Sequence, residues 1–230
     1  MASFNTDKQA KIHELIMEYL EFTKSNDYSE QDKFEFFKRT NKLLSAIDET
    51  NAILLLSEVK PAGTIDKNFA YFMDALVAVA KENPKQFWSE LSNLYRNRID
   101  LADRIDRFEK YAAPLIEKKT TMGKADLRNI SLLLAIYDSS SYPIYKSKEF
   151  RGIGGKNPVD GVLSKIGISK MKFNDVGQSY FGRGYSIFFS FCTELLVEMK
   201  KCPELASANM LTVQDFIHVV GSDFYGHGML

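Results

Sequence analysis

Cysteine is scarce in this chain of 230 residues, which holds only Cys192 and Cys202. A helix over about 180–201 would separate the two thiols by roughly 15 Å, too far for a disulfide bond. Their spacing fits no zinc pattern, and Cys192 falls in a Phe-rich run where a buried, unreactive thiol is expected. We therefore expect two free thiols in a reducing compartment.

Long apolar runs are also absent. No run reaches the roughly 18 residues of a transmembrane helix, so we expect neither a membrane span nor a membrane partner. The first residues, MASFNTDKQAK, carry early charges and lack the apolar core of a signal peptide. Both absences favour a cytoplasmic protein.

The motifs of common catalytic sites are missing as well. RGIGGKNP (151–158) resembles a phosphate-binding loop, but Phe150 and Asn157 stand where that loop needs glycine and serine or threonine. A flexible loop is the plain interpretation, although amides of a Gly-rich turn could hold a phosphate. His218 falls in an apolar helix, where a packing or surface role is expected. We expect no enzyme activity, no metal and no cofactor.

Hydrophobic periodicity indicates helices along most of the chain. Apolar residues recur at helical spacing over about 7–24, 30–47, 66–82, 84–96, 100–117, 128–138, 180–201 (or 185–201) and 212–220. VDGVLSKIG (159–167) could supply one further short helix. No alternating run indicates a strand, and periodicity does not decide whether 53–59 is a short strand or a helical turn. We predict a mainly α protein of about seven to nine helices, with one helical domain over 1–220 and a flexible tail or linker at 221–230.

The helix over 66–82 has a strong pattern, with one apolar face formed by Phe69, Phe72, Met73, Leu76 and Val79 or Ala80. Asn83 and Pro84 end it and begin the next helix, whose predicted buried residues are Phe87, Trp88, Leu91 and Leu94. The two helices should therefore supply much of the core.

The helix over 100–117 carries opposite charges four residues apart, in the pairs Asp100–Arg104, Asp103–Arg107 and Asp106–Lys110. Pairs in this order stabilise a helix by a few tenths of a kcal/mol each. We interpret the charge run as a solvated helix face and not as a site.

A basic segment at 142–184 follows the predicted helix over 128–138, in which Leu133 and Leu134 are expected in the core. The segment holds eight cations against three anions, a net charge of +5, in a chain with no net charge. It also holds eight of the 13 glycines, which predicts a Gly-rich basic loop or a small β insert. The charge imbalance is a hint of a polyanionic partner.

Aromatic residues alternate with these cations. Cations can contact phosphates and aromatic rings can stack on bases, so the segment is a candidate DNA-binding surface. In the alternative interpretation, Tyr142, Phe150 and Phe181 pack the loop onto the helices while the cations solvate it. The candidate DNA-binding residues are Tyr142, Tyr145, Lys146, Lys148, Arg151, Lys156, Lys170, Lys172 and Arg183.

Four stretches, in this order, resemble the helical region ahead of the motor domain in many McrB-type AAA+ ATPases of prokaryotic restriction and defence systems. They are NLYRNRIDLADRIDRF (93–108), ISLLLAIYDSSSYPIYKSKEF (130–150), YSIFFSFCTELLVEMKK (185–201) and LTVQDFIHVV (211–220). Each motif alone is unspecific, and their joint order carries the resemblance. Together they cover about half of the chain.

The resemblance implies a non-catalytic target-recognition module for antiviral defence. Its implied partners are double-stranded DNA, with or without modified bases, and an AAA+ motor domain or a nuclease subunit. No Walker motif is present, so the chain would be an excised N-terminal domain or a stand-alone relative. The alternative function is a protein-interaction module that docks an ATPase, a nuclease or another copy of itself. A third, a hydrolytic enzyme, would need a site assembled from residues far apart in sequence.

Overall fold

The computed structural model describes residues 4–25, 31–59, 67–96, 99–152, 160–168 and 181–222. In these ranges the backbone forms eleven α-helices and one 3-10 helix, and no strand. The prediction of a mainly α protein is confirmed. The predicted number of helices was too low, because α8 (Ser147–Arg151) is too short to show a periodic pattern and the ambiguous run at 53–59 belongs to the helix α3 (Ala52–Glu58).

The remaining elements follow in chain order. They are α1 (Thr6–Ser25), α2 (Gln31–Leu44), α4 (Lys67–Glu82), α5 (Pro84–Tyr95), α6 (Leu101–Ile116), α7 (Leu127–Tyr137), α9 (Val162–Lys165), α10 (Phe181–Met199), η1 (Pro203–Leu205) and α11 (Met210–Gly221). The described part of the basic segment contains no strand. Its residues 153–159 and 169–180 lie outside the described ranges. The tail predicted at 221–230 is wrong for Gly221, which is the last residue of α11, and residues 223–230 lie outside the described ranges.

The chain divides into two compact units. Unit 1 comprises Met1–Ser29, Ser140–Asp175 and Ile187–Leu230, and unit 2 comprises Glu30–Ser139 and Val176–Ser186. The two are interleaved along the chain, so each unit is assembled from segments that the other interrupts. The expectation of one domain over 1–220 stays a prediction.

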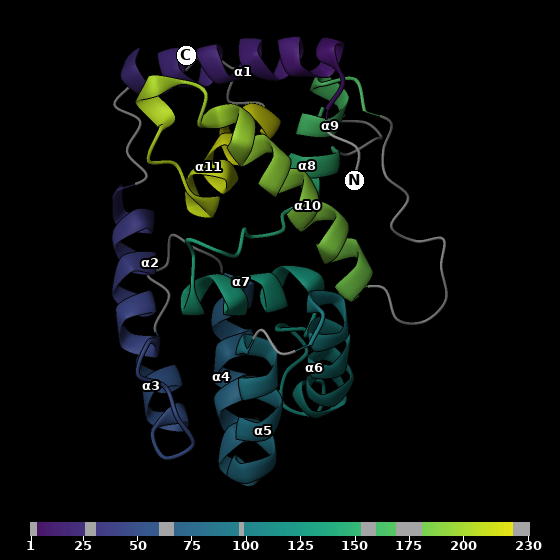
Figure 1. Ribbon diagram of the computed structural model, residues 1–230. Helices are drawn as coiled ribbons and strands as arrows, with labels where there is room; N and C mark the ends of the chain where they lie inside the picture. Colours follow the sequence, from purple (N-terminus) through teal and green to yellow (C-terminus); the bar gives the residue numbers. More distant parts are fainter. Residues whose placement is uncertain are drawn as a thin grey trace. The chain divides into compact units, whose positions relative to one another are not determined.

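Unit 2 is organised around α4, which packs against α3, α5, α6 and α7 (Figure 1). The apolar face predicted for α4 is buried, with Phe69, Phe72 and Leu76 fully inaccessible. The Asn83 side chain accepts a hydrogen bond from the Gln86 N–H and so caps α5, as Asn83-Pro84 predicted. Of the residues predicted to be buried in α5, Phe87, Leu91 and Leu94 are fully inaccessible, whereas Trp88 is half-buried.

Helix α6 uses its charged side chains for tertiary contacts. Arg104 is only 4% exposed, and its Nη1 donates hydrogen bonds to the carbonyl oxygens of Leu94, at 2.9 Å, and Arg96, at 3.2 Å. These carbonyls lie at the end of α5, where a helix leaves oxygens without donors. The Asp106 side chain accepts from the N–H of Gly182 at 2.8 Å. The interpretation of the α6 charges as a solvated face is therefore wrong for Arg104.

Helix α7 is the buried scaffold helix that the sequence predicts, with Leu133 and Leu134 fully inaccessible. Its last carbonyls, of Ala135 and Ile136, both accept hydrogen bonds from the Asn41 side chain of α2. At its end Tyr137 stacks on Tyr95 of α5, with ring centroids 4.0 Å apart. The helix is thus tied to α2 and α5 by side chains that face it.

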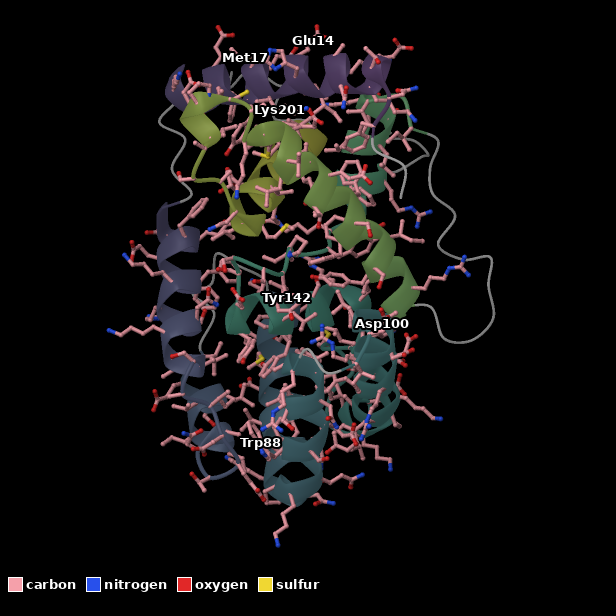
Figure 2. The ribbon with its side chains drawn as sticks, viewed as in Figure 1. Glu14, Met17, Trp88, Asp100, Tyr142 and Lys201 are labelled. Carbon is pink, nitrogen blue, oxygen red and sulfur yellow. The ribbon has the colours of Figure 1, made fainter. Side chains whose placement is uncertain are left out.

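Unit 1 consists of α1, α8, α9, η1, α11 and the part of α10 from Ile187 onward. Tyr19 of α1 donates a hydrogen bond from its hydroxyl to the buried carboxylate of Asp215 on α11 at 2.9 Å. Glu14 and Met17 project from the outer side of α1 (Figure 2). Among the described helices, none has both the length and the apolar character required to cross a membrane.

Candidate functional site

The nine candidate DNA-binding residues fall into three groups. Lys156, Lys170 and Lys172 lie outside the described residues. Arg183 is exposed on α10 in unit 2. The other five belong to unit 1, in the stretch that ends with α8: Tyr142, Tyr145, Lys146, Lys148 and Arg151.

The two tyrosines are buried, at 6% exposure for Tyr142 and 7% for Tyr145. The ring of Tyr142 lies 6.4 Å from that of Phe189, and the ring of Tyr145 lies edge-on to Phe188 at 5.2 Å. Rings packed in this way cannot stack on bases without leaving the core. The burial of Tyr142 agrees with the alternative interpretation, and Tyr145, which that interpretation did not include, is buried in the same way.

Helix α8 is anchored by Phe150, whose side chain is fully buried. Its ring contacts Phe188 at 4.8 Å and Phe191 at 5.1 Å, both on α10 and both edge-on. Edge-on aromatic pairs contribute roughly 0.5–1.5 kcal/mol beyond the area they bury. A five-residue helix that would not form alone is therefore held in place by tertiary packing.

The carboxylate of Glu149 links α8 to α11. Its Oε1 lies 3.9 Å from Nζ of Lys146 and 3.7 Å from Nδ1 of His218. Burial raises the pKa of Glu149, but the nearby His218 side chain and the charge of Lys146 outweigh burial and lower the pKa to about 2. Part of the positive charge of Lys146 is thus compensated within the protein.

Replacing Glu149 by glutamine should reduce the free energy of unfolding at neutral pH by about 1–2 kcal/mol. Because the folded pKa of about 2 is below the usual 4.5, the ionised carboxylate stabilises the fold above pH 4.5. That contribution falls as the pH drops toward 2, so the difference from the unmodified protein should narrow in acid. Urea unfolding at several pH values measures it.

The matched control for this prediction is Glu35→Gln. Glu35 lies in a solvent-exposed pair with Lys38 at 3.7 Å, where loss of the charge should change stability by less than about 0.5 kcal/mol at any pH. A difference between the Glu149 variant and the unmodified protein that stays constant with pH would contradict the assignment.

Lys148 is the exposed cation of α8, and Arg151 is half-buried at its end. Beyond α8, the chain returns at Gly161 to the backbone of Gly152, so close that a Cβ on Gly161 would lie 2.2 Å from the Gly152 nitrogen. Glycine is required there because no side chain fits. Gly161 therefore lies directly against the end of α8.

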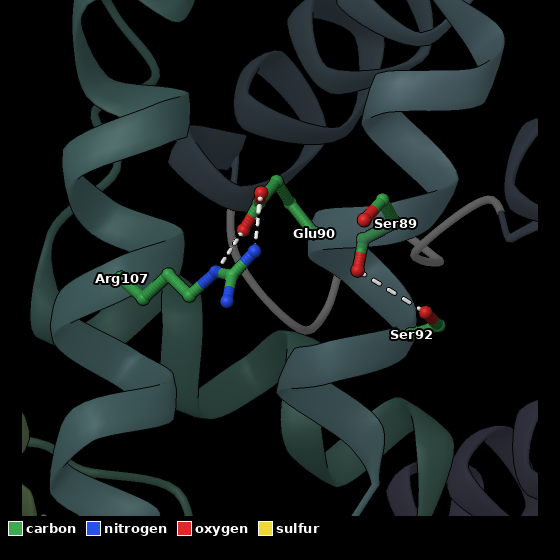
Figure 3. Close-up of polar contacts among 4 residues, drawn as sticks. All are labelled: Ser89, Glu90, Ser92 and Arg107. Atoms are coloured by element: carbon green, nitrogen blue, oxygen red, sulfur yellow. Dashed lines mark hydrogen bonds and ion pairs between the residues drawn. The ribbon is translucent and has the colours of Figure 1, made fainter.

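A second polar cluster lies in unit 2, in an open groove of about 440 Å³ between α5 and α6. Arg107 donates from Nε and Nη2 to the two carboxylate oxygens of Glu90, at 2.6 and 2.8 Å (Figure 3). On α5, Ser92 donates from its hydroxyl to the backbone carbonyl of Ser89, also drawn there. Arg107 was predicted to pair with Asp103 on its own helix, and the structure gives it a partner on α5 instead.

This cluster has no arrangement suited to catalysis. Both oxygens of Glu90 are held by Arg107, so the carboxylate is not poised to take a proton. Burial and the charge of Glu90 raise the pKa of the neighbouring Tyr111, which keeps its hydroxyl protonated. An ion pair at a surface groove contributes little to stability, because solvent screens its charges. We interpret the pair as a connection between two helices.

Thiol and metal chemistry receive no support from the described residues. Cys192 and Cys202 are both free and buried, and burial raises the pKa of the Cys192 thiol well above its usual value. A thiol in that environment is a poor nucleophile. Within the described ranges, no group of three or more His, Cys, Asp or Glu side chains is placed to hold a metal ion.

The chain matches no protein-family model, and neither the curated proteins nor the solved structures gave a match. The resemblance to the N-terminal region of McrB-type ATPases therefore stays a prediction from the four sequence motifs.

Two features of the structure were not predicted from the sequence. The Glu149–His218 contact was not predictable, because 69 positions separate the two residues and no motif joins them. A groove between α3 and α4 has a signal in the sequence, because Asp74 and Lys81 stand two helical turns apart with Val77 and Ala78 between them.

Proposed function

We propose that this protein is a non-catalytic DNA-recognition module that holds the phosphate backbone of double-stranded DNA through its basic segment. The supporting observation is the net charge of +5 over 142–184, attached to a helix, α8, that is fixed by Phe150 and Glu149. Exposed Lys148 extends from this fixed point. Cations on a rigid base contact phosphates without a large loss of conformational entropy on binding.

The proposal assigns no contact with DNA bases to the two tyrosines of the segment. With Tyr142 and Tyr145 in the core, this module would contact DNA mainly through charge. If the protein distinguishes DNA sequences or modified bases, residues other than these tyrosines would contact the bases. A prokaryotic restriction or defence system with an AAA+ motor or a nuclease subunit remains the proposed context, on the sequence resemblance alone.

Charge-dominated binding predicts a steep salt dependence. If about six phosphates are engaged, the logarithm of the association constant should fall with the logarithm of salt concentration with a slope near −5. Replacing Lys148, Lys156, Lys170 and Lys172 by alanine should bring that slope to about −2 and weaken binding about a hundredfold at moderate salt. Fluorescence anisotropy with a labelled duplex measures both quantities.

The matched control removes four exposed lysines of unit 1 outside the basic segment: Lys11, Lys24, Lys200 and Lys201. It changes the net charge equally and should leave the slope near −5. The proposal would be contradicted if the DNA affinity of the unmodified protein did not depend on salt, or if both variants lost the same amount of DNA affinity. Comparing methylated with unmethylated duplexes shows whether a modification is read.

A protein-interaction module is the second candidate function. The observation that favours it is the groove between α3 and α4, which has an apolar floor and is lined by described residues of unit 2. This function does not require the basic segment, so the two candidates can be tested separately.

A further inference from the structure

The groove of unit 2 has a volume of about 560 Å³ and lies between α4 and the end of α3. Its apolar side is formed by Leu56 of α3, by Val59 directly after α3, and by Val77 and Ala78 of α4. Helix α4 packs against α5, α6 and α7 through its other faces. Val77 and Ala78 are consequently half-buried, next to residues of the same helix that are fully buried.

Two opposite charges border this apolar patch on α4. Asp74 and Lys81 are both exposed and both line the groove. Seven residues correspond to about two helical turns, or roughly 10 Å, so the two side chains lie on the same face. Val77 and Ala78 lie midway between them. Along this face of α4 the order is therefore an acid, two small apolar residues and a base.

We propose that this face binds a second copy of the chain, with the two α4 helices antiparallel across a two-fold axis at Val77 and Ala78. A two-fold interface brings residue i of one copy to residue j of the other, and j to i. Asp74 of each copy then faces Lys81 of the other. Val77 meets the small Ala78 of the second copy, which allows close approach of the helices.

The self-complementary charge pattern is what favours a second copy over an unrelated protein. A parallel pairing of the two helices would bring like charges together, whereas the antiparallel pairing satisfies both charges twice. Specific interfaces bury about 800 Å² from each partner, which is more than one helix face supplies. Leu54 on α3 and Tyr71 on α4, which are 61% and 45% exposed, are further apolar side chains on the two helices that form the groove. The inference deepens the second candidate function and is independent of DNA binding.

Charge reversal tests the pairing directly. D74K and K81D each place like charges at both symmetric contacts, so each should raise the dimer Kd about 10- to 30-fold. The double variant D74K/K81D restores the complementarity and should restore the dimer. An equimolar mixture of the two single variants should form a heterodimer. Sedimentation velocity over a wide range of protein concentrations measures all four.

The matched controls are E35K and K38D, which make the same charge changes in an exposed pair on α2 and should leave the dimer Kd unchanged. An unmodified protein that is monomeric at every concentration would overturn the inference. So would a dimer that D74K and K81D do not weaken, or that the double variant does not restore. Anisotropy with the same duplex on the same variants keeps the two functions apart, because these substitutions leave the basic segment intact.

Discussion

Replacing Asn41 by alanine is expected to lower the free energy of unfolding by about 3 kcal/mol. The side-chain amide of Asn41 donates to the carbonyl oxygens of Ala135 and Ile136, at 2.9 and 2.8 Å. Its oxygen accepts from the backbone N–H of Ser139 at 3.1 Å and from the hydroxyl of the same residue at 2.6 Å. Alanine would leave these groups without partners at the end of α7, where Ser139 is buried.

Two further substitutions test whether the loss of stability comes from the hydrogen bonds of the Asn41 side chain. Asn41→Asp keeps the size but replaces the donating amide with an acceptor that faces two carbonyl oxygens, so at neutral pH it should destabilise at least as much. Asn51→Ala is the matched control, because Asn51 also donates to a backbone carbonyl, that of Ala46, but in an exposed turn. It should cost about 1 kcal/mol or less. Urea unfolding in which the alanine variants at 41 and 51 cost the same would contradict the assigned role.

The helices of unit 2 show what a sequence pattern can predict. The six residues assigned to the apolar face of α4 are all buried, because one stripe of large side chains at helical spacing leaves a helix only one way to face a core. The start of α5 at Pro84 was also predictable, since its capping residue and proline act within one helical turn. Local patterns of this kind need no knowledge of the rest of the fold.

Long-range polar contacts were not predictable in the same way. Arg107 has an acid four residues before it, yet it pairs with Glu90 of α5. Arg104 has a similar local partner, yet it is buried against carbonyls at the end of α5. Local ion pairs contribute only a few tenths of a kcal/mol, so tertiary geometry decides which partner is taken. Asn41 carries no local signal at all, because its partners lie more than 90 positions away.

The candidate DNA-binding surface was predictable as a charged segment and not as a set of contact residues. Lys148 is exposed as expected, but the alternation of aromatics and cations could not show that Tyr142 and Tyr145 face the core. A tyrosine has an apolar ring and a polar hydroxyl, so both positions suit it. Whether the ring is buried or exposed depends on Phe188 and Phe189, which belong to a helix more than 40 positions later in the chain.

Replacing Gly221 by alanine is expected to lower the free energy of unfolding by about 3 kcal/mol and to displace α8 from α11. The added Cβ would lie 1.9 Å from the carbonyl oxygen of Glu149 and 2.7 Å from its carbonyl carbon. These are backbone atoms, which cannot rotate away as a side chain can. Displacement of α8 would also disturb the contact between Glu149 and His218, so the helix that carries Lys148 would lose a fixed position.

Gly167→Ala separates this steric effect from the ordinary cost of replacing glycine. Gly167 has a φ of +70°, but a Cβ there would meet only the mobile end of Lys11, at 3.3 Å. The Gly167 variant should lose about 1–2 kcal/mol of the free energy of unfolding, from backbone strain alone. If α8 is the fixed base of the DNA contact, the Gly221 variant should also lose DNA affinity at temperatures where it is fully folded, whereas the Gly167 variant should keep it. Equal stability of the two variants would contradict the steric prediction, because it would show that α8 and α11 move apart at little cost in free energy. Equal DNA affinity of the two variants would show that DNA binding does not need a fixed α8.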